Sequence, residues 1–138
     1  MRLVVDANAV FSMLIAFGNK SCDLLFLGLV DLSAPEYLLG EIWEHELEII
    51  EKSCLKPAQV RDALELIASK VKFIPFPEYA PFILKAESIC PDPDDAEYFA
   101  VALSLHCPLW SNDKELKKQD FVKVLSTSEL LQLLSTRN

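Results

Sequence analysis

Short apolar runs rich in β-forming residues alternate with longer stretches of helical periodicity along this sequence. The runs cover residues 2–6, 30–35, 71–76, 109–111 and 122–126. Consecutive strands that are separated by helices pair in parallel, because each crossover returns the chain to the same end of the sheet. We therefore predict an α/β fold with a parallel or mostly parallel sheet covered on both faces. No linker, repeat or low-complexity segment interrupts the pattern, so residues 1–138 are expected to form a single domain.

The stretches between these runs predict helices, several of which carry start and stop signals. The predicted helices cover residues 7–18, 21–30, 36–53, 57–70, 78–88, 94–106 and 127–135, with a helical turn within 112–119. Ser33 and Glu36 have the spacing of a capping box, with Pro35 inside the start. Ser126 or Thr127 is expected to cap the last helix, with Glu129 nearby.

The predicted helix over residues 36–53 also shows an apolar stripe, which indicates the face that it buries. The stripe consists of Leu39, Trp43, Leu47 and Ile50, widened by Leu38, Ile42 and Ile49.

The composition is that of a globular protein without membrane segments. Hydrophobic residues make up 51% of the chain and charged residues 25%, which is enough apolar material for a core. No apolar run approaches the roughly 20 residues needed to span a bilayer, and no signal peptide is apparent. The cysteines (Cys22, Cys54, Cys90 and Cys107) form no C-x-x-C pair, and His45 and His106 complete no zinc pattern. We expect reduced cysteines and a cytoplasmic location.

The formal net charge of −8 argues against a broad basic face that holds nucleic acid. It fits either a solvated acidic surface or a carboxylate site that recruits metal cations. A small basic flank is available near Asp113, although the same residues could simply form a solvated helix face. These residues are Lys114, Lys117, Lys118 and Lys123.

Carboxylates stand where the predicted strands end. Asp6 ends the first strand, Asp113 follows a later one, and Glu41 lies early in the helix after the second strand. Ligands of open parallel sheets bind beyond the carboxyl ends of the strands. The helix that begins near Asp92 to Asp95 is expected to present its N-terminus at the same edge, so four segments direct acids toward one rim.

Each acid also has a purely structural explanation. Asp6 could belong to a turn with Asn8, Glu41 could lie on a solvated helix face, and Asp113 could cap the following turn. In "PDPDD", Asp92 could be the N-cap, with Asp95 as the third helical residue. Taken together, however, crowded carboxylates need either raised pKa values or a cation among them, and oxygen-only ligands suit Mg²⁺ or Mn²⁺.

Three stretches resemble the motifs of the PIN-domain nucleases. They are "LVVDANAVFS", "SAPEYLLGEIWEHELEI" and "PDPDDAEYFAVALSLHCPLWSND", and their order and spacing cover nearly the whole chain. The resemblance implies a doubly wound three-layer α/β sandwich. It also implies that the acids that hold the metal and take part in catalysis are Asp6, Glu41, Asp95 and Asp113. Asp92, Asn8 and Ser111 match secondary positions beside that site.

Two features depart from the family pattern. Trp110 is bulkier than the aliphatic residue expected before the small hydroxyl residue. The triplet Asp92, Asp94 and Asp95 leaves the third ligand open, and the alignment of "DDAEYFAVAL" favours Asp95, with Asp92 as the cap.

The resemblance further implies a divalent-metal-dependent nuclease, an endoribonuclease that hydrolyses RNA phosphodiester bonds. Toxins of toxin–antitoxin pairs share this fold, so an antitoxin protein is a possible partner. A homodimer is expected from family habit and from the apolar segments 22–30 and 78–88. The alternative is a catalytically silent PIN-like module for binding or assembly. An aspartyl phosphatase is disfavoured, because Asn8 stands where its second acid would be.

Overall fold

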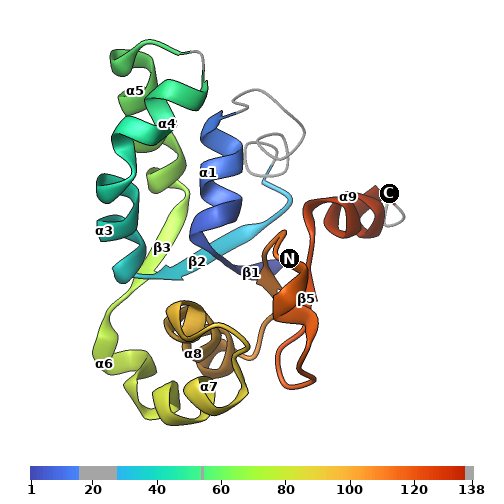
Figure 1. Cartoon of the computed structure of the whole chain (residues 1–138). Helices are drawn as coiled ribbons and strands as arrows, with labels where there is room; N and C mark the ends of the chain where they lie inside the picture. Colours follow the sequence, from blue (N-terminus) through green and yellow to red (C-terminus); the bar gives the residue numbers. More distant parts are fainter. Residues whose placement is uncertain (16–27, 54, 136–138) are drawn as a thin grey trace.

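A five-stranded, fully parallel sheet forms the centre of the molecule. The computed structural model describes residues 1–15, 28–53 and 55–135. The strands are β1 (Arg2–Val5), β2 (Asp31–Pro35), β3 (Val71–Ile74), β4 (Leu109–Trp110) and β5 (Val124–Leu125), in the order β3-β2-β1-β4-β5. Every neighbouring pair is parallel, as Figure 1 shows for β1, β2 and β3. The predicted α/β fold is therefore confirmed.

Helices cover both faces of this sheet (Figure 1). One face carries α1 (Ala7–Ile15), α3 (Tyr37–Glu44), α4 (Glu46–Ser53) and α5 (Pro57–Ser69). The other carries α6 (Phe76–Tyr79), α7 (Ile83–Ile89) and α8 (Ala96–Leu105), with α8 packed against β1 and β2. The C-terminal helix α9 (Thr127–Ser135) follows β5. The predicted helix over 21–30 falls mostly outside the described residues.

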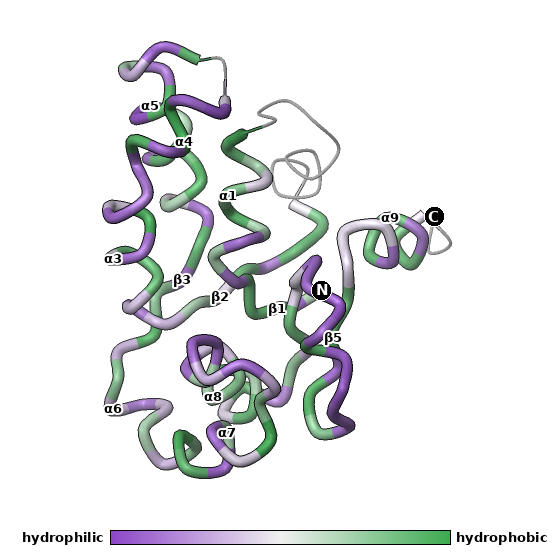
Figure 2. Tube along the Cα trace, viewed as in Figure 1, coloured by the Kyte–Doolittle hydropathy of each residue, from purple (hydrophilic) through white to green (hydrophobic). Residues whose placement is uncertain are grey.

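The core lies where the central strand meets the helices on both faces. Leu3, Val4 and Val5 of β1 are completely buried, as are Phe99 and Val101 of α8. A strand buried on both faces has a continuous apolar sequence, and β1 has one. Figure 2 shows hydrophobic and hydrophilic residues alternating along α3, α4 and α8, as expected for helices with one face on a sheet.

The single helix predicted over residues 36–53 is wrong, because the chain forms two helices that are separated at His45. The His45 ring packs edge-on against Phe11 of α1, with ring centroids 5.4 Å apart. The predicted capping box is also wrong. Ser33 is paired within β2, and the residue before α3 is Glu36, which makes no side-chain cap.

The apolar stripe predicted for this region is only partly correct. Leu38, Ile42 and Ile49 are buried, whereas Trp43 is 60% exposed and Leu47 78% exposed. The apolar residues are too many for one helical face, so the packing of α3 and α4 on their neighbours decides which of them are covered.

The segment predicted as one helix over residues 78–88 is divided into α6, the 3₁₀ turn η1 (Ala80–Phe82) and α7. Pro81 cannot donate a backbone hydrogen bond to the preceding turn, so a continuous helix through this position is disfavoured. Other boundaries agree closely with prediction. Ser126 and Glu129 cap α9 reciprocally, each side chain accepting from the other's backbone N–H at 3.1 Å.

Within the described residues, no helix combines the length and apolarity that a membrane crossing requires. Cys90 and Cys107 are free thiols, as predicted, while Cys22 and Cys54 lie outside the described residues.

Candidate active site

Asp6 stands between the central strand β1 and α1, and its side chain is almost fully buried. Its backbone N–H donates to the Trp110 carbonyl at 3.3 Å, which ties it to β4. Its Oδ1 accepts from the Ala9 N–H at 2.9 Å and so caps α1. The other oxygen, Oδ2, is buried without a hydrogen-bond partner among the described residues. An unsatisfied buried oxygen is costly, so Oδ2 is an atom that a ligand would stabilise.

Burial is the main reason that the pKa of Asp6 is raised to about 6, and the charges of Asp113 and Glu41 add to this effect. The Ala9 N–H and the nearby Ser111 hydroxyl act in the opposite direction. Of these two groups, only the Ala9 N–H meets the geometry of a hydrogen bond to the carboxylate, so the Ser111 hydroxyl does not satisfy Oδ2.

Glu41 reaches the rim from α3 and is held there by a tyrosine of α8. The Tyr98 hydroxyl donates to Glu41 Oε1 at 2.7 Å. Burial raises the pKa of Glu41, the Tyr98 hydrogen bond lowers it, and the charges of Glu44 and Asp94 raise it further. Burial and the adjacent carboxylate place the pKa of Tyr98 well above its usual range, so the phenol remains a donor.

The acidic triplet is divided between two roles. Asp92 precedes the 3₁₀ turn η2 (Pro93–Asp95), and its Oδ1 accepts from the Asp94 N–H at 3.0 Å. The predicted cap is therefore present, although it caps a 3₁₀ turn rather than α8 directly. Asp95 precedes α8 but its side chain makes no capping hydrogen bond. Its role as a ligand stays a prediction.

Asp95 is exposed to the charges of the other rim carboxylates. Burial raises its pKa to about 7, and the charges of Asp6, Asp92, Asp113 and Glu41 all contribute in the same direction. Asp6 and Asp95 thus lie within electrostatic range of each other and of Glu41 and Asp113, which agrees with the predicted topology. Burial is the main cause of both raised pKa values, and a cation among these carboxylates would offset the repulsion that adds to it.

Asp113 follows β4 and is fixed by its neighbours. Its Oδ1 accepts from the Glu115 N–H at 3.0 Å and caps the turn η3 (Lys114–Lys117), while its own N–H donates to Ser111 Oγ at 3.1 Å. Ser111 itself is buried. The predicted capping role of Asp113 is present, and one carboxylate oxygen remains outside that hydrogen bond.

Trp110, which departs from the family pattern, anchors the end of β4. Its side chain is completely buried, and its Nε1 donates to Thr127 Oγ1 at 2.9 Å. Asn112 donates to the same Oγ1 at 3.1 Å and accepts from the Thr127 N–H at 2.8 Å. Sequence reasoning missed Asn112 and Thr127, since nothing in the sequence pairs residues that meet only when α9 follows β5.

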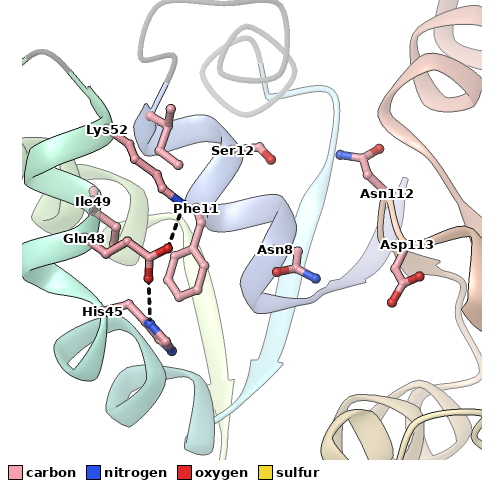
Figure 3. A pocket seen from close by; sticks show the side chains of 10 residues that line it. Asn8, Phe11, Ser12, His45, Glu48, Ile49, Lys52, Asn112 and Asp113 are labelled. Atoms are coloured by element: carbon pink, nitrogen blue, oxygen red, sulfur yellow. Dashed lines mark hydrogen bonds and ion pairs between the residues drawn. The ribbon is translucent and has the colours of Figure 1, made fainter.

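A cavity of 480 Å³ opens beside Asp113 (Figure 3). Its lining consists of Asn8, Phe11, Ser12, Ile15, His45, Glu48, Ile49, Lys52, Asn112 and Asp113. Figure 3 shows Asn8, at the start of α1, between Asp113 and Phe11 in this view. On the far wall, Glu48 accepts from Lys52 Nζ at 2.7 Å and contacts His45 Nδ1 at 3.2 Å. The sequence indicates no site role for His45 beyond the absence of a zinc pattern, whereas the structure places it between α3 and α4 on this wall.

The basic flank predicted near Asp113 is partly committed to ion pairs. Lys117 pairs with Glu129, and Lys118 Nζ lies 2.6 Å from Glu115 Oε2. Lys114 and Lys123 are exposed. The solvated interpretation therefore describes at least half of the flank.

Oxygen donors at the rim suit a hard divalent cation, and the unpartnered Asp6 Oδ2 is consistent with one. As the side chains of the described residues stand, however, no three His, Cys, Asp or Glu residues form a group that could hold a metal ion. Binding would therefore require side-chain adjustment, water ligands or both.

A doubly wound parallel sandwich with carboxylates at the carboxyl ends of its strands defines a class of α/β proteins with a polar rim site. A family model described as a PIN domain matches residues 4–135. The chain belongs to the PIN domain family.

Two solved structures show the same fold. A chain from the crystal structure of VapBC2 from Rickettsia felis, bound to a DNA fragment from their promoter, superposes with a TM-score of 0.66 at 15% identity, covering 91% of this chain and 98% of that one. PAE2754 from Pyrobaculum aerophilum superposes with a TM-score of 0.69 at 17% identity, covering 99% of this chain and 90% of that one. No functionally curated protein matches the sequence.

Proposed function

We propose that this protein is a divalent-metal-dependent endoribonuclease that hydrolyses RNA phosphodiester bonds. Its ligands for Mg²⁺ or Mn²⁺ would be Asp6, Glu41, Asp95 and Asp113. The observation that carries the proposal is the buried, unpartnered Oδ2 of Asp6 in a PIN domain. The charges of Glu41 and Asp113 add to the burial that raises the pKa values of Asp6 and Asp95. A bound divalent cation supplies electrostatic stabilisation to the attacking water and the leaving oxygen of a phosphodiester.

The four acids that would bind this cation are positioned in different ways. Asp6 is fixed through Oδ1 and offers Oδ2, and Asp113 is fixed by the Glu115 N–H. Glu41 approaches from α3, with Oε1 held by the Tyr98 hydroxyl. Asp95 approaches from the start of α8, where its side chain makes no capping hydrogen bond. Ser111 Oγ orients Asp113 by accepting from the Asp113 N–H, and Asn8 lies on the same side of the cavity as α1. Asp92 caps the turn that precedes Asp95 and α8.

The cavity beside Asp113 supports RNA as the substrate. Asn8, Ser12 and Asn112 line it, and the hydrogen-bonded side chains of His45, Glu48 and Lys52 form its far wall. These polar groups can contact an RNA strand that lies across the rim. The overall charge of −8 makes the local cation important, since it reverses the sign of the potential where the phosphate must approach.

The fold also supports an antitoxin protein as partner and a homodimer as the working form. Similarity to a chain of the VapBC2 structure supports the first. Exposed apolar side chains such as Leu84, 81% exposed on α7 within the predicted apolar segment 78–88, support the second. We further propose that the protein is cytoplasmic and that residues 1–138 form a single domain.

A catalytically silent binding or assembly module is the second candidate. One observation favours it, namely that no three potential ligands converge among the described side chains. Such a module would use the same rim and cavity as a contact surface without turnover.

A Mn²⁺ titration combined with a cleavage assay separates the two functions. The nuclease requires saturable Mn²⁺ binding and cleavage of single-stranded RNA, and both should be lost in Asp6→Asn. Asp62→Asn serves as the control, because Asp62 is an exposed acid on α5. Saturable Mn²⁺ binding without cleavage of any RNA tested would favour the silent module, and no saturable binding would exclude the metal site.

A further inference from the structure

We infer that Tyr98 is a positioning residue for Glu41, which holds this carboxylate at the rim in the orientation that the cation needs. This inference depends on the proposed metal site. The hydroxyl of Tyr98 donates to Glu41 Oε1 at 2.7 Å across two helices, α8 and α3. The two residues are far apart in sequence, so the contact exists only in the folded protein.

Tyr98 is well suited to this task because it cannot move easily. Its side chain is 1% exposed, and α8 packs on β1 and β2, the strands at the centre of the sheet. The Tyr37 ring of α3 meets the Tyr98 ring edge-on, with centroids 6.3 Å apart and planes at 66°. The hydroxyl oxygen is therefore fixed in space. Rotation about the C–O bond of the phenol is enough to direct its proton toward Glu41.

Glu41, by contrast, needs restraint. It is partly exposed, it has a long side chain, and like charges on Glu44 and Asp94 surround it. A free glutamate in such surroundings turns toward solvent, where its rotamer freedom is larger and its charge is better hydrated. The Tyr98 hydrogen bond occupies Oε1 and leaves Oε2 for a ligand, which is the usual arrangement of a hydrogen-bonded carboxylate beside a metal ion.

Helix α8 thus contributes twice to the rim. Asp95 precedes its first residue, and Tyr98 follows three positions later, a spacing that places both on the same side of a helix. One helix therefore presents a candidate ligand and also fixes a second ligand from α3. Any movement of α8 relative to α3 would change both carboxylates together.

The chain supplies a matched control in Tyr79. This tyrosine is also 1% exposed, and its hydroxyl donates to Glu97 Oε1 at 2.6 Å. Glu97 is not one of the four proposed ligands. Tyr79→Phe therefore removes a comparable buried tyrosine–glutamate hydrogen bond without touching Glu41, and it reports what the loss of such a bond does to the fold alone.

The experiment measures the Mn²⁺ dissociation constant by calorimetry for the parent, Tyr98→Phe, Tyr79→Phe, Glu41→Gln and the double variant Tyr98→Phe/Glu41→Gln. We expect Tyr98→Phe to weaken Mn²⁺ binding by about 10- to 100-fold, the usual effect of removing a group that orients a metal ligand. Tyr79→Phe should bind Mn²⁺ like the parent. In the Glu41→Gln background, Tyr98→Phe should have no further effect, because the carboxylate it positions is gone.

Each result separates this inference from the proposed function. Parent protein without saturable Mn²⁺ binding overturns the metal site and the positioning role together. Parent binding that is lost in Glu41→Gln but unchanged in Tyr98→Phe leaves the nuclease proposal standing and overturns only the role of Tyr98. Equal weakening in Tyr98→Phe and Tyr79→Phe also overturns it, since both would then act through general stability.

A measurement on the parent keeps the test decisive if Tyr98→Phe does not fold. When Mn²⁺ binds Glu41, the hydrogen bond from the Tyr98 hydroxyl to Glu41 Oε1 should weaken. This weakening should change the near-ultraviolet absorption of Tyr98. The chain has only three tyrosines, so the Mn²⁺ difference spectrum can be compared with that of Tyr79→Phe. A difference spectrum that is absent in the parent, or that persists unchanged in Glu41→Gln, would contradict the inference.

Discussion

The backbone N–H of Asp95 donates to the carbonyl of Asp92 at 3.0 Å, yet the two side chains face different tasks. Asp92 caps its turn through the Asp94 N–H, whereas the carboxylate of Asp95 makes no capping bond. We predict that Asp92→Ala lowers the free energy of unfolding by about 1 kcal/mol and leaves cleavage activity largely intact. Asp95→Ala should remove most activity without a comparable loss of stability. Urea unfolding and RNA cleavage measured side by side check both predictions. Equal loss of activity in the two variants with an unchanged free energy of unfolding would show that the assignment of Asp92 to capping and Asp95 to the metal is wrong.

Replacement of Asp6 by Asn should stabilise the metal-free protein. The change removes a buried charge at nearly constant volume, and the amide oxygen can still accept from the Ala9 N–H. We expect the melting temperature in EDTA at about pH 8 to rise by roughly 2–5 °C. The gain on adding Mn²⁺ should shrink, because stabilisation by a ligand follows its affinity for the folded state.

The same variant measured at about pH 5 provides the control, since parent Asp6, with a pKa of about 6, is then mostly protonated and the advantage of Asn should disappear. An Asp6→Asn protein that melts lower than the parent in EDTA, and gains as much from Mn²⁺, would contradict the four-carboxylate site.

Stability of the metal-free protein should fall as the pH rises from about 5 to about 8. The folded-state pKa values of Asp6 and Asp95, about 6 and about 7, both lie above their ordinary value of 3.8. Between the ordinary and the raised values the folded state binds more protons than the unfolded state, so this part of the stability is present at low pH and is lost as pH passes the raised values. Thermal melts in EDTA across this range measure the slope.

Saturating Mn²⁺ should flatten or reverse this pH dependence, because the cation replaces the protons at the rim. Asp62→Asn should leave the slope as it is, whereas Asp95→Ala should reduce it. A metal-free protein that is equally stable across the range would show that the pKa values of Asp6 and Asp95 are not raised in the folded state.

Self-association should depend on the apolar side chains that α7 exposes. Leu84→Glu is expected to shift the protein from dimer toward a 15.5 kDa monomer in sedimentation experiments, because a charge replaces an apolar side chain that is 81% exposed. Leu66→Glu, at a 44% exposed position on α5, is the control and should leave the dimer unchanged. Parent protein that remains monomeric at high concentration would contradict the proposed dimer.

Elements defined by local signals could be predicted from the sequence. Pro57 starts α5, the Ser126–Glu129 pair caps α9, and Asp6 follows a strand whose apolar residues are continuous. These features depend on backbone chemistry within a few residues. The strand ends also place Asp6 and Asp113 at one edge of the sheet, because topology alone brings the carboxyl ends of parallel strands together.

Features decided by tertiary packing could not be predicted in the same way. The contact of His45, at the break between α3 and α4, with Phe11 joins residues of different helices, and the exposure of Trp43 depends on which face of α3 is covered. The hydrogen bonds from Trp110 and Asn112 to Thr127 require the turn of the chain after β5. The Tyr98–Glu41 contact joins residues that no sequence period relates.

The order of the strands has a consequence for how the rim comes into being. β1 lies at the centre of the sheet, between β2 and β4, so Asp6 meets Asp113 only after the crossover that brings β4 beside β1 has closed. Contacts over such sequence separations form late, because loop-closure entropy must be overcome before they stabilise anything. A nascent chain that has emerged only as far as α8 therefore lacks one wall of the rim, and the complete set of candidate acids is assembled only late in folding.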